Sequence, residues 1–364
     1  MTNHKVQSSK FKAQCEKKIL ILDGAMGTEI QKYNLTEEDF RGDRFRDVPG
    51  MMKGNNDMLN ITRPDVISDI YRRYLEAGAD IITANTFSCQ RISQADYHLE
   101  DCAREMAFEG ARLARIECDK FSTPDKPRFV AGDVGPTNKT CSMSPDVSDP
   151  AAREITYDEL FTDVCEQVDG LIEGGADVIL IETIFDTLNC KAMIDAAITM
   201  MKKHGVEVPI MISLTVSDLA GRTLSGQTVD AFLASLSPYP IFSVGMNCAF
   251  GAPQMKPFIE HLAKVAPYYI SAHPNAGLPN EMGQYDETAE SMAPPDCQLS
   301  MRVSSISSVL LWTVLNSSPI MPEVLRERNR IRWWRSLSIC GSLVLDLLQV
   351  DDFRSSAGRC QPLR

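Results

Sequence analysis

The chain has 364 residues, of which 44% are hydrophobic and 24% charged, as is typical of a globular protein with one barrel-sized domain or two ordinary ones. Its formal net charge of −12 argues against nucleic acid and anionic membranes as main partners. The N-terminus is polar and rich in Lys, and no run of about 18 apolar residues occurs. We therefore expect no signal peptide, no membrane span and a cytoplasmic location. The 11 Cys form no C-x-x-C pair and are expected to be free thiols.

Short apolar runs recur along the chain and predict buried strands. Each is rich in Ile or Val and is bounded by Gly, Pro, Asn or Asp. Continuous apolar runs, rather than alternating ones, are typical of parallel strands that are covered on both faces. The seven predicted strands are Ile19–Leu22, Asp80–Ala84, Arg128–Gly132, Asp177–Ile181, Ile210–Leu214, Phe242–Met246 and Tyr268–Ala272.

Helical patterns lie between several of these runs. Residues Pro64–Ala77 form the clearest one, with Pro in the first turn and Gly78 as the stop signal. Residues Tyr157–Gly174 follow the same plan. The apolar stripe of the first helix consists of Val66, Ile67, Ile70, Tyr74 and Leu75.

A short internal repeat links helix to strand. The sequence Glu-Ala-Gly-Ala-Asp-Ile-Ile at 76–82 resembles Glu-Gly-Gly-Ala-Asp-Val-Ile at 173–179. In both, a helix ends on Gly and a strand follows almost at once. The alternation of strands and helices predicts an α/β fold of the (β/α)₈ TIM-barrel type, with the last strand–helix unit missing or replaced. An open doubly wound sheet is the alternative, which the lack of a G-x-G-x-x-G after any strand weakens.

The composition changes abruptly after residue 293. Residues 294–364 contain no Lys, nine Arg, all three Trp and only two of the 21 Gly. We interpret 1–17 as a polar N-terminal extension, 18–293 as the barrel, and 294–364 as a non-homologous tail that is disordered or loosely docked. The tail is either foreign to the barrel, through an alternative exon, a frameshift or a gene-model error, or a divergent C-terminal element. Its apolar candidates for an eighth strand are Ser308–Leu315 and Leu343–Leu348.

The residues that follow the strands could carry chemistry, because catalytic groups of parallel barrels sit at the C-terminal ends of strands. Asp23-Gly24 alone could be an ordinary turn, and Cys248 alone a core thiol. Glu182 directly follows a buried strand, so its carboxylate needs a partner. That partner is either a substrate ammonium or a neighbouring Arg or Lys.

Seven motifs occur in one order, and their combination is far more specific than any one of them. Together they closely resemble the homocysteine-binding domain of cobalamin-dependent methionine synthase, within the homocysteine S-methyltransferase family, over about residues 18–292. The motifs are Asp23-Gly-Ala-Met-Gly-Thr28, Ala84-Asn-Thr-Phe87, Gly135-Pro-Thr-Asn138, Ile181-Glu-Thr-Ile-Phe-Asp186, Gly221-Arg-Thr-Leu-Ser-Gly226, Gly245-Met-Asn-Cys248 and Pro274-Asn-Ala-Gly-Leu-Pro279.

The resemblance implies a barrel that holds Zn²⁺ through three Cys thiolates, with the homocysteine sulfur as the fourth ligand. Cys248 matches the first of these thiolates. The other two form an adjacent Cys-Cys pair in the family, and this sequence has none, because Cys297, Cys340 and Cys360 are isolated. The loss matters because catalytic zinc needs three protein ligands and because coordination is what turns a thiol into a nucleophilic thiolate.

The resemblance also implies a cradle for the amino acid. Asp23 and Glu182 are expected to hold the ammonium group, while Asn85, Thr86 and Asn275 are expected to contact the carboxylate or support the site. Gly24 completes the predicted substrate-binding set, and Cys248 is the predicted metal ligand. The methyl donor is expected to be methylcobalamin on a separate module, because cobalamin and folate modules cannot fit in 364 residues.

Three functional hypotheses follow. The leading one is a homocysteine S-methyltransferase module of methionine synthase that is truncated and impaired. The second is an inactive isoform or pseudoenzyme, at most a weak amino-acid binder. The third, a generic barrel lyase or aldolase, would need a catalytic Lys or a phosphate site near the late strands, and neither is evident.

Overall fold

The computed structural model describes residues 4–276 and 309–312 as alternating helices and strands. Their order confirms the α/β class predicted from the sequence. The elements are α1 (His4–Cys15), β1 (Leu20–Ile21), α2 (Met26–Gln31), α3 (Glu37–Arg41), α4 (Leu59–Thr62), α5 (Pro64–Ala77), β2 (Ile81–Thr83), α6 (Arg91–Gln94), η1 (Ala95–Tyr97), η2 (Glu100–Cys102), α7 (Ala103–Phe121), β3 (Phe129–Val134), α8 (Tyr157–Gly174), β4 (Val178–Ile184), α9 (Thr187–His204), β5 (Ile210–Leu214), α10 (Val229–Leu236), β6 (Ser243–Gly251), α11 (Ala252–Val265), β7 (Tyr269–Asn275) and β8 (Val309–Trp312).

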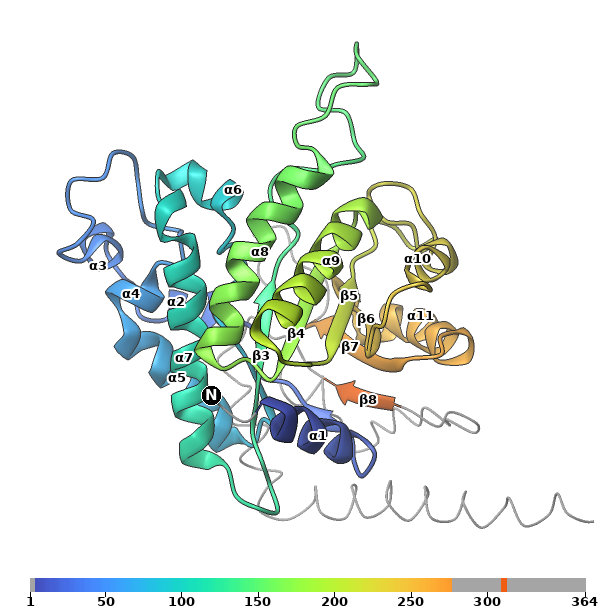
Figure 1. Cartoon of the computed structure of the whole chain (residues 1–364), viewed down its shortest axis with the longest axis horizontal. Coiled ribbons are helices and arrows are strands. Elements are labelled where there is room, and N and C mark those ends of the chain that lie inside the picture. Colours follow the sequence, from blue (N-terminus) through green and yellow to red (C-terminus); the bar gives the residue numbers. More distant parts are fainter. Residues whose placement is uncertain (1–3, 277–308, 313–364) are drawn as a thin grey trace, which may run out of the picture.

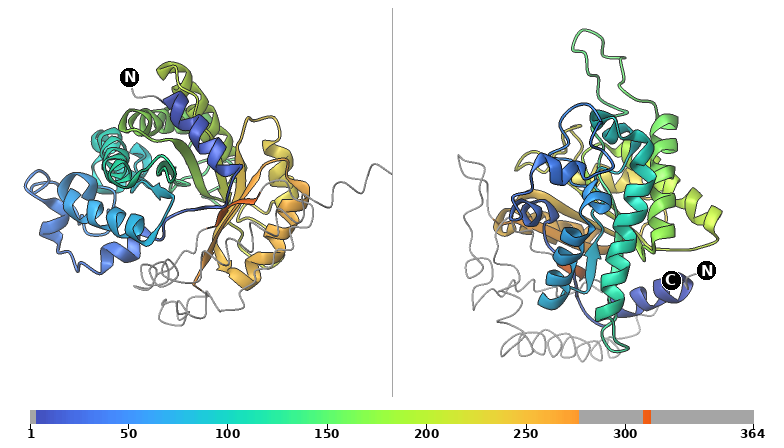
Figure 2. Two further views of the ribbon diagram at one scale, coloured as in Figure 1. Left: turned by 90° about the horizontal axis from the view of Figure 1, so that it is seen from below. Right: turned by 90° about the vertical axis from the view of Figure 1, so that its left-hand side faces the viewer.

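The described strands form one parallel sheet in the order β1-β8-β7-β6-β5-β4-β3-β2. The sheet curls until β1 reaches β2, where Leu22 and Ile81 form a parallel bridge. Helices α5, α7, α8 and α9 lie side by side on the outside of the sheet (Figure 1; Figure 2 gives two further views). The arrangement confirms the barrel class, in which the carboxyl ends of all strands meet at one rim.

The structure describes an eighth strand at the place where the sequence predicted a missing or replaced unit. Strand β8 lies between β7 and β1, and it falls inside the apolar candidate Ser308–Leu315. It therefore comes from the segment whose composition differs from that of the barrel. The second candidate, Leu343–Leu348, and the rest of the predicted tail lie outside the described residues.

All seven predicted strands are present, but four of them run further than the sequence indicated. Strands β3, β4, β6 and β7 end at Val134, Ile184, Gly251 and Asn275. The prediction stopped where the apolar run stopped, although polar residues there keep the backbone pairing, as the register of Asn247 with His273 shows. Residues expected to follow the strands therefore lie within strand ends.

The two predicted helices have the predicted bounds. The apolar stripe of α5 is buried in full, and Gly78 ends the helix in the left-handed conformation at φ +115°. Gly175 does the same for α8 at φ +101°. Only a residue without a Cβ adopts this conformation at no steric cost, so the repeated Gly fixes where each helix turns toward its strand. Among the described residues, no helix is long and apolar enough to cross a membrane.

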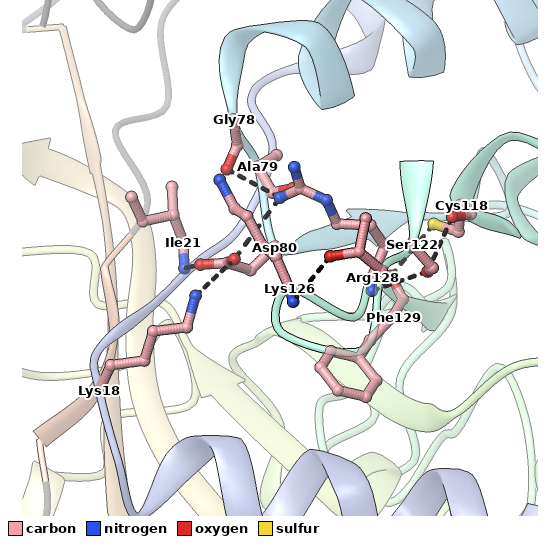
Figure 3. Close-up of polar contacts among 11 residues, drawn as sticks. Lys18, Ile21, Gly78, Ala79, Asp80, Cys118, Ser122, Lys126, Arg128 and Phe129 are labelled. Atoms are coloured by element: carbon pink, nitrogen blue, oxygen red, sulfur yellow. Dashed lines mark hydrogen bonds and ion pairs between the residues drawn. The ribbon is translucent and has the colours of Figure 1, made fainter. Parts of the chain in front are cut away.

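The Asp of the internal repeat fastens neighbouring strands together. Asp80 is buried; its amide donates to the Ile21 carbonyl at 2.8 Å, and its Oδ2 accepts from the Ile21 amide at 3.2 Å. Lys18 neutralises the carboxylate through a 2.8 Å contact to Oδ1 (Figure 3). Asp177 makes the same pair of bonds to Val130, both at 2.8 Å. The repeat thus sets the register of β2 on β1 and of β4 on β3.

The polar N-terminal extension contains a helix that packs on the barrel. Phe11 of α1 is fully buried, and its ring centroid lies 5.1 Å from that of Phe129 and 5.5 Å from that of Phe242. These two residues stand where β3 and β6 begin. Helix α1 therefore covers the end of the barrel opposite the strand carboxyl ends, and the inward-facing side chains of the strands meet it there.

We predict that Phe11→Ala lowers the free energy of unfolding by about 3 kcal/mol, because it leaves a cavity among buried rings. Chemical denaturation of the full chain measures this. Lys10→Ala, at an exposed position of the same helix, is the control and should change stability by less than about 0.5 kcal/mol. Equal effects of the two substitutions would show that α1 does not contribute to the folded domain.

Candidate functional site

One cavity opens at the rim where the strands carry their carboxyl ends. Its volume is about 360 Å³, and its walls come from the segment after β1, the loop before α4, the end of β2 with the segment that follows it, and single residues of β3, β4, β6 and β7. The lining residues are Leu22, Asp23, Gly24, Ala25, Met26, Gly27, Gly54, Asn56, Asp57, Thr83, Ala84, Asn85, Thr86, Phe87, Ser88, Asp133, Glu182, Cys248 and His273.

Six of the seven site residues predicted from the sequence line this cavity together. They are Asp23, Gly24, Asn85, Thr86, Glu182 and Cys248. The seventh, Asn275, is not in the lining, and its side-chain amide donates to the Cys248 carbonyl at 2.9 Å. The geometry therefore brings the predicted set to one place, while the role of each residue in binding stays a prediction.

The segment after β1 reaches the cavity in close contact with α5. The Thr83 amide donates to Asp23 Oδ2 at 2.9 Å, which holds the carboxyl group against the end of β2. A Cβ on Gly24 would lie 2.8 Å from the Tyr74 hydroxyl, so only Gly fits at this position. That hydroxyl donates to the Ala25 carbonyl at 3.0 Å and fixes the turn.

Asn85 and Thr86 build the wall with their side-chain donors. The Asn85 amide donates to the Asn56 carbonyl at 2.8 Å and to Asn60 Oδ1 at 3.0 Å. The Thr86 hydroxyl donates to the Asp133 carbonyl at 2.8 Å. These bonds hold the β2 end against the loop before α4 and against β3, which gives the wall a defined shape.

The cavity is strongly acidic. Asp57 and Asp133 join Asp23 and Glu182 in its lining, and no Lys or Arg is among the described residues that line it. Burial raises the pKa of Asp23 to about 8 and the pKa values of Asp57 and Glu182 to about 7. Burial, reinforced by Glu182, also holds the pKa of Asp133 well above its usual range. In each case desolvation is the main cause, and no cation of the described lining offsets it.

Two buried side chains of the lining have an unused polar atom. Asp133 Oδ1 and His273 Nε2 make no hydrogen bond within the described part of the chain. Burial lowers the pKa of His273 to about 4, so its imidazole is neutral near pH 7. A ligand in the cavity could satisfy either atom, because a buried polar group without a partner is costly.

Cys248 lies on the β6 side of the cavity in a strained conformation. Its φ is +56°, which is rare for any residue other than Gly, and its Sγ accepts a hydrogen bond from Asn247 Nδ2 at 3.3 Å. The surrounding walls, with the Glu182 carboxylate, raise the pKa of the thiol to about 12. Near neutral pH the group is therefore a thiol rather than a thiolate.

The described residues do not fit the three-thiolate zinc site that the sequence resemblance implies. Cys248 is the one thiol among the cavity-lining residues that the structure describes. In the same part of the chain, no group of three or more His, Cys, Asp or Glu side chains is close enough to hold a metal ion. Catalytic zinc requires three protein ligands.

The site set predicted from the sequence did not include Asp57, Asp133 or His273, which line the cavity. The last two could have been found, because Asp133 directly follows the predicted strand Arg128–Gly132 and His273 directly follows Tyr268–Ala272. Asp57 lies in a loop before α4, and no strand or helix pattern places that loop at the rim.

Comparison with known proteins agrees with this geometry. The profile of the family described as Homocysteine S-methyltransferase matches residues 20–314. The chain belongs to the homocysteine S-methyltransferase family. The matched range begins at β1 and includes β8.

Solved structures of one family protein share the fold. The homocysteine methyltransferase MmuM from Escherichia coli, in its metallated form, is 18% identical, with a TM-score of 0.64, 87% of this chain and 99% of that chain being covered. Its oxidised form gives the same values. Its apo form is also 18% identical, with a TM-score of 0.57 over 85% of this chain and 95% of that chain. At this identity the likeness concerns the fold.

We predict that Asp23→Asn stabilises the protein more at pH 8 than at pH 5. Burial raises the pKa of Asp23 in the folded state to about 8. The folded protein therefore loses stability as the pH rises from the pKa of Asp23 in the unfolded chain toward 8, because the unfolded chain ionises this group first. The neutral amide avoids this cost, by at most about 1.4 kcal/mol per pH unit. Thermal unfolding of both proteins across this range measures the difference, with the exposed Asp125→Asn as control. A difference that does not change with pH would contradict the expectation.

We also predict that the full chain binds Zn²⁺ far more weakly than a three-thiolate site, because Cys248 alone cannot replace three ligands. Metal analysis after dialysis against a mild chelator measures retained zinc. Stoichiometric zinc that disappears in Cys248→Ala would contradict this prediction, and would mean that thiols outside the described residues complete the site.

Proposed function

We propose that this cavity binds L-homocysteine, and that the chain is a methyl-acceptor module of the methionine synthase type. The observation that carries the proposal is the placement of Asp23 and Glu182 in the same acidic cavity as Cys248. Family membership supports methyl transfer to homocysteine as the associated chemistry.

The charge of the cavity supports an ammonium ligand. Asp23 and Glu182 repel one another, since the charge of Glu182 contributes to the raised pKa of Asp23. Buried carboxylates become stable in ionised form when a cation comes within hydrogen-bonding distance. The ammonium group of an amino acid is such a cation, and it can donate to both carboxylates at once.

The same charge orients the ligand. With its ammonium near Asp23 and Glu182, homocysteine would direct its own carboxylate away from them, toward the β2 side of the cavity that Asn85 and Thr86 form. Its thiol would then extend toward Cys248 on β6. This orientation gives Asp23 and Glu182 their predicted role, while Asn85 and Thr86, whose side chains donate within the wall, support its shape.

In the proposed reaction, the homocysteine thiol releases its proton to solvent and its sulfur bonds the methyl carbon to give the thioether of methionine, while the donor–carbon bond breaks and its electron pair stays on the donor. We propose methylcobalamin on a separate cobalamin-bearing module as donor, with folate modules also acting in trans. The described residues hold and orient the acceptor. No step is assigned to zinc, because these residues do not supply its three ligands.

A second candidate function is binding of the amino acid without turnover. It is favoured by the absence of an adjacent Cys pair from the sequence and by the protonated state of Cys248. Calorimetric titration of the full chain with L-homocysteine tests binding, and methionine formation from methylcobalamin tests turnover. Binding without methionine would select this second candidate, and no binding would reject both.

We predict that Glu182→Gln weakens L-homocysteine binding about 10- to 150-fold, because the neutral amide cannot replace a charge-assisted bond to the ammonium. Calorimetry measures the Kd. Glu117→Gln is the matched control, because Glu117 is a buried carboxylate outside the cavity that pairs with Lys120. An unchanged Kd in Glu182→Gln would remove this residue from the site.

A further inference from the structure

Asn247 lies beneath the cavity and links the ends of neighbouring strands through its side chain. It is fully buried on β6, and its side chain contacts the ends of three neighbouring strands. Its Oδ1 accepts from the Thr183 amide of β4 at 3.2 Å and from the Ser213 hydroxyl of β5 at 2.8 Å. Its Nδ2 donates to Thr183 Oγ1 at 2.7 Å and to Cys248 Sγ at 3.3 Å. Every polar atom of this amide is therefore used between strands.

The two residues that Asn247 holds are both strained. Thr183 has φ +59° and Cys248 has φ +56°, a left-handed conformation that β-branched Thr in particular avoids. Such residues persist only when the surrounding structure over-determines them. For Thr183, the two bonds from Asn247 supply that constraint.

The strands are irregular at the same places. The register of β4 on β5 shifts between Ile181 and Ile184, and that of β6 on β7 shifts between Asn247 and Gly251. Irregularities of this kind re-aim side chains next to functional sites. Here they turn Glu182 and Cys248 into the cavity. Asn275 holds the Cys248 carbonyl from the other side at 2.9 Å.

We propose that Asn247 is the positioning residue of this site, which fixes the Glu182–Thr183 turn of β4 and Cys248 of β6 relative to one another through one shared amide. The residue does not line the cavity and acts through its neighbours. The consequence for homocysteine rests on the proposed function, whereas the effect on the two strand ends does not.

Asn247→Ala in the full chain tests the geometry without any ligand. We expect hydrogen exchange at the Thr183 amide to accelerate about tenfold or more, because its acceptor is lost. We also expect Cys248 to react more slowly with iodoacetamide at fixed pH, because the donor that stabilises its thiolate is lost. Peptide mass spectrometry reads both sites.

The control is Asn189→Ala. Asn189 is also a buried Asn with several hydrogen bonds, to Cys141, Pro136 and Lys139, and it lies outside the cavity lining. A loss of general stability would appear in both variants. Faster exchange at Thr183 and slower alkylation at Cys248 should appear only in Asn247→Ala.

Asn247→Asp separates the bonds that Asn247 accepts from Thr183 and Ser213 from the bond that it donates to Cys248. It also provides a test if Asn247→Ala does not fold. The carboxylate still accepts from Thr183 and Ser213, but it cannot donate to the Cys248 sulfur. Exchange at Thr183 should stay near the wild-type rate, while alkylation of Cys248 should slow.

L-Homocysteine provides the final readout. Asn247→Ala should raise its Kd about tenfold, and the effect should not add to that of Glu182→Gln, because both act on the same carboxylate. Unchanged Thr183 exchange and Cys248 alkylation in Asn247→Ala would overturn the proposal, and so would strictly additive effects on the Kd. If the wild-type chain does not bind homocysteine, the proposed function fails, and exchange and alkylation alone decide the role of Asn247.

Discussion

The architecture depends on a buried Asp that ties the start of one strand to its neighbour. Asp80 and Asp177 each exchange two hydrogen bonds with a single residue of the adjacent strand, Ile21 and Val130. In a parallel sheet the hydrogen bonds do not fix where a strand begins, and a slip by one residue would turn each side chain to the other face. The Gly–Ala–Asp repeat prevents that slip at β1–β2 and at β3–β4, and the first of these junctions is also where the sheet closes on itself.

The register at the start of each strand determines which side chains lie at its carboxyl end. With the register set, Asp133, Glu182, Cys248 and His273 lie toward the carboxyl ends of β3, β4, β6 and β7 and line one cavity. The two ends of each strand thus obey opposite rules. At the start, each buried Asp has a Lys or Arg partner, whereas the carboxylates of the rim have no cation among the described residues that line the cavity. The paired carboxylates at the strand starts stabilise the fold, whereas the carboxylates of the rim are stabilised in ionised form only when a cation binds.

Much of this could be predicted from the sequence, for reasons that differ by element. The bounds of α5 were correct because a 3.6-residue stripe, Pro at its start and Gly78 at its end all agree. Strand ends were placed too early wherever an apolar run gave way to polar residues that still pair, as at Asn247. Most site residues follow predicted strands, and the resemblance to the family singled them out. Asp57 was not among them, since it reaches the rim through a loop, and neither the strained φ of Thr183 nor its link to Asn247 leaves a trace in composition.

Under the proposed function, holding the amino acid and activating its sulfur are physically separate tasks. The first needs carboxylates and a shaped wall, and in our proposal Asp23, Glu182 and Asn85, which line one cavity, provide both. The second needs a charge strong enough to deprotonate a thiol, and the cavity acts against it, since desolvation and, in addition, the Glu182 carboxylate raise the pKa of the Cys248 thiol. The electrostatic field that favours an ammonium group therefore disfavours a thiolate beside it. Under the proposed function, methyl transfer therefore needs a compensating cation near Cys248, whereas binding of homocysteine does not.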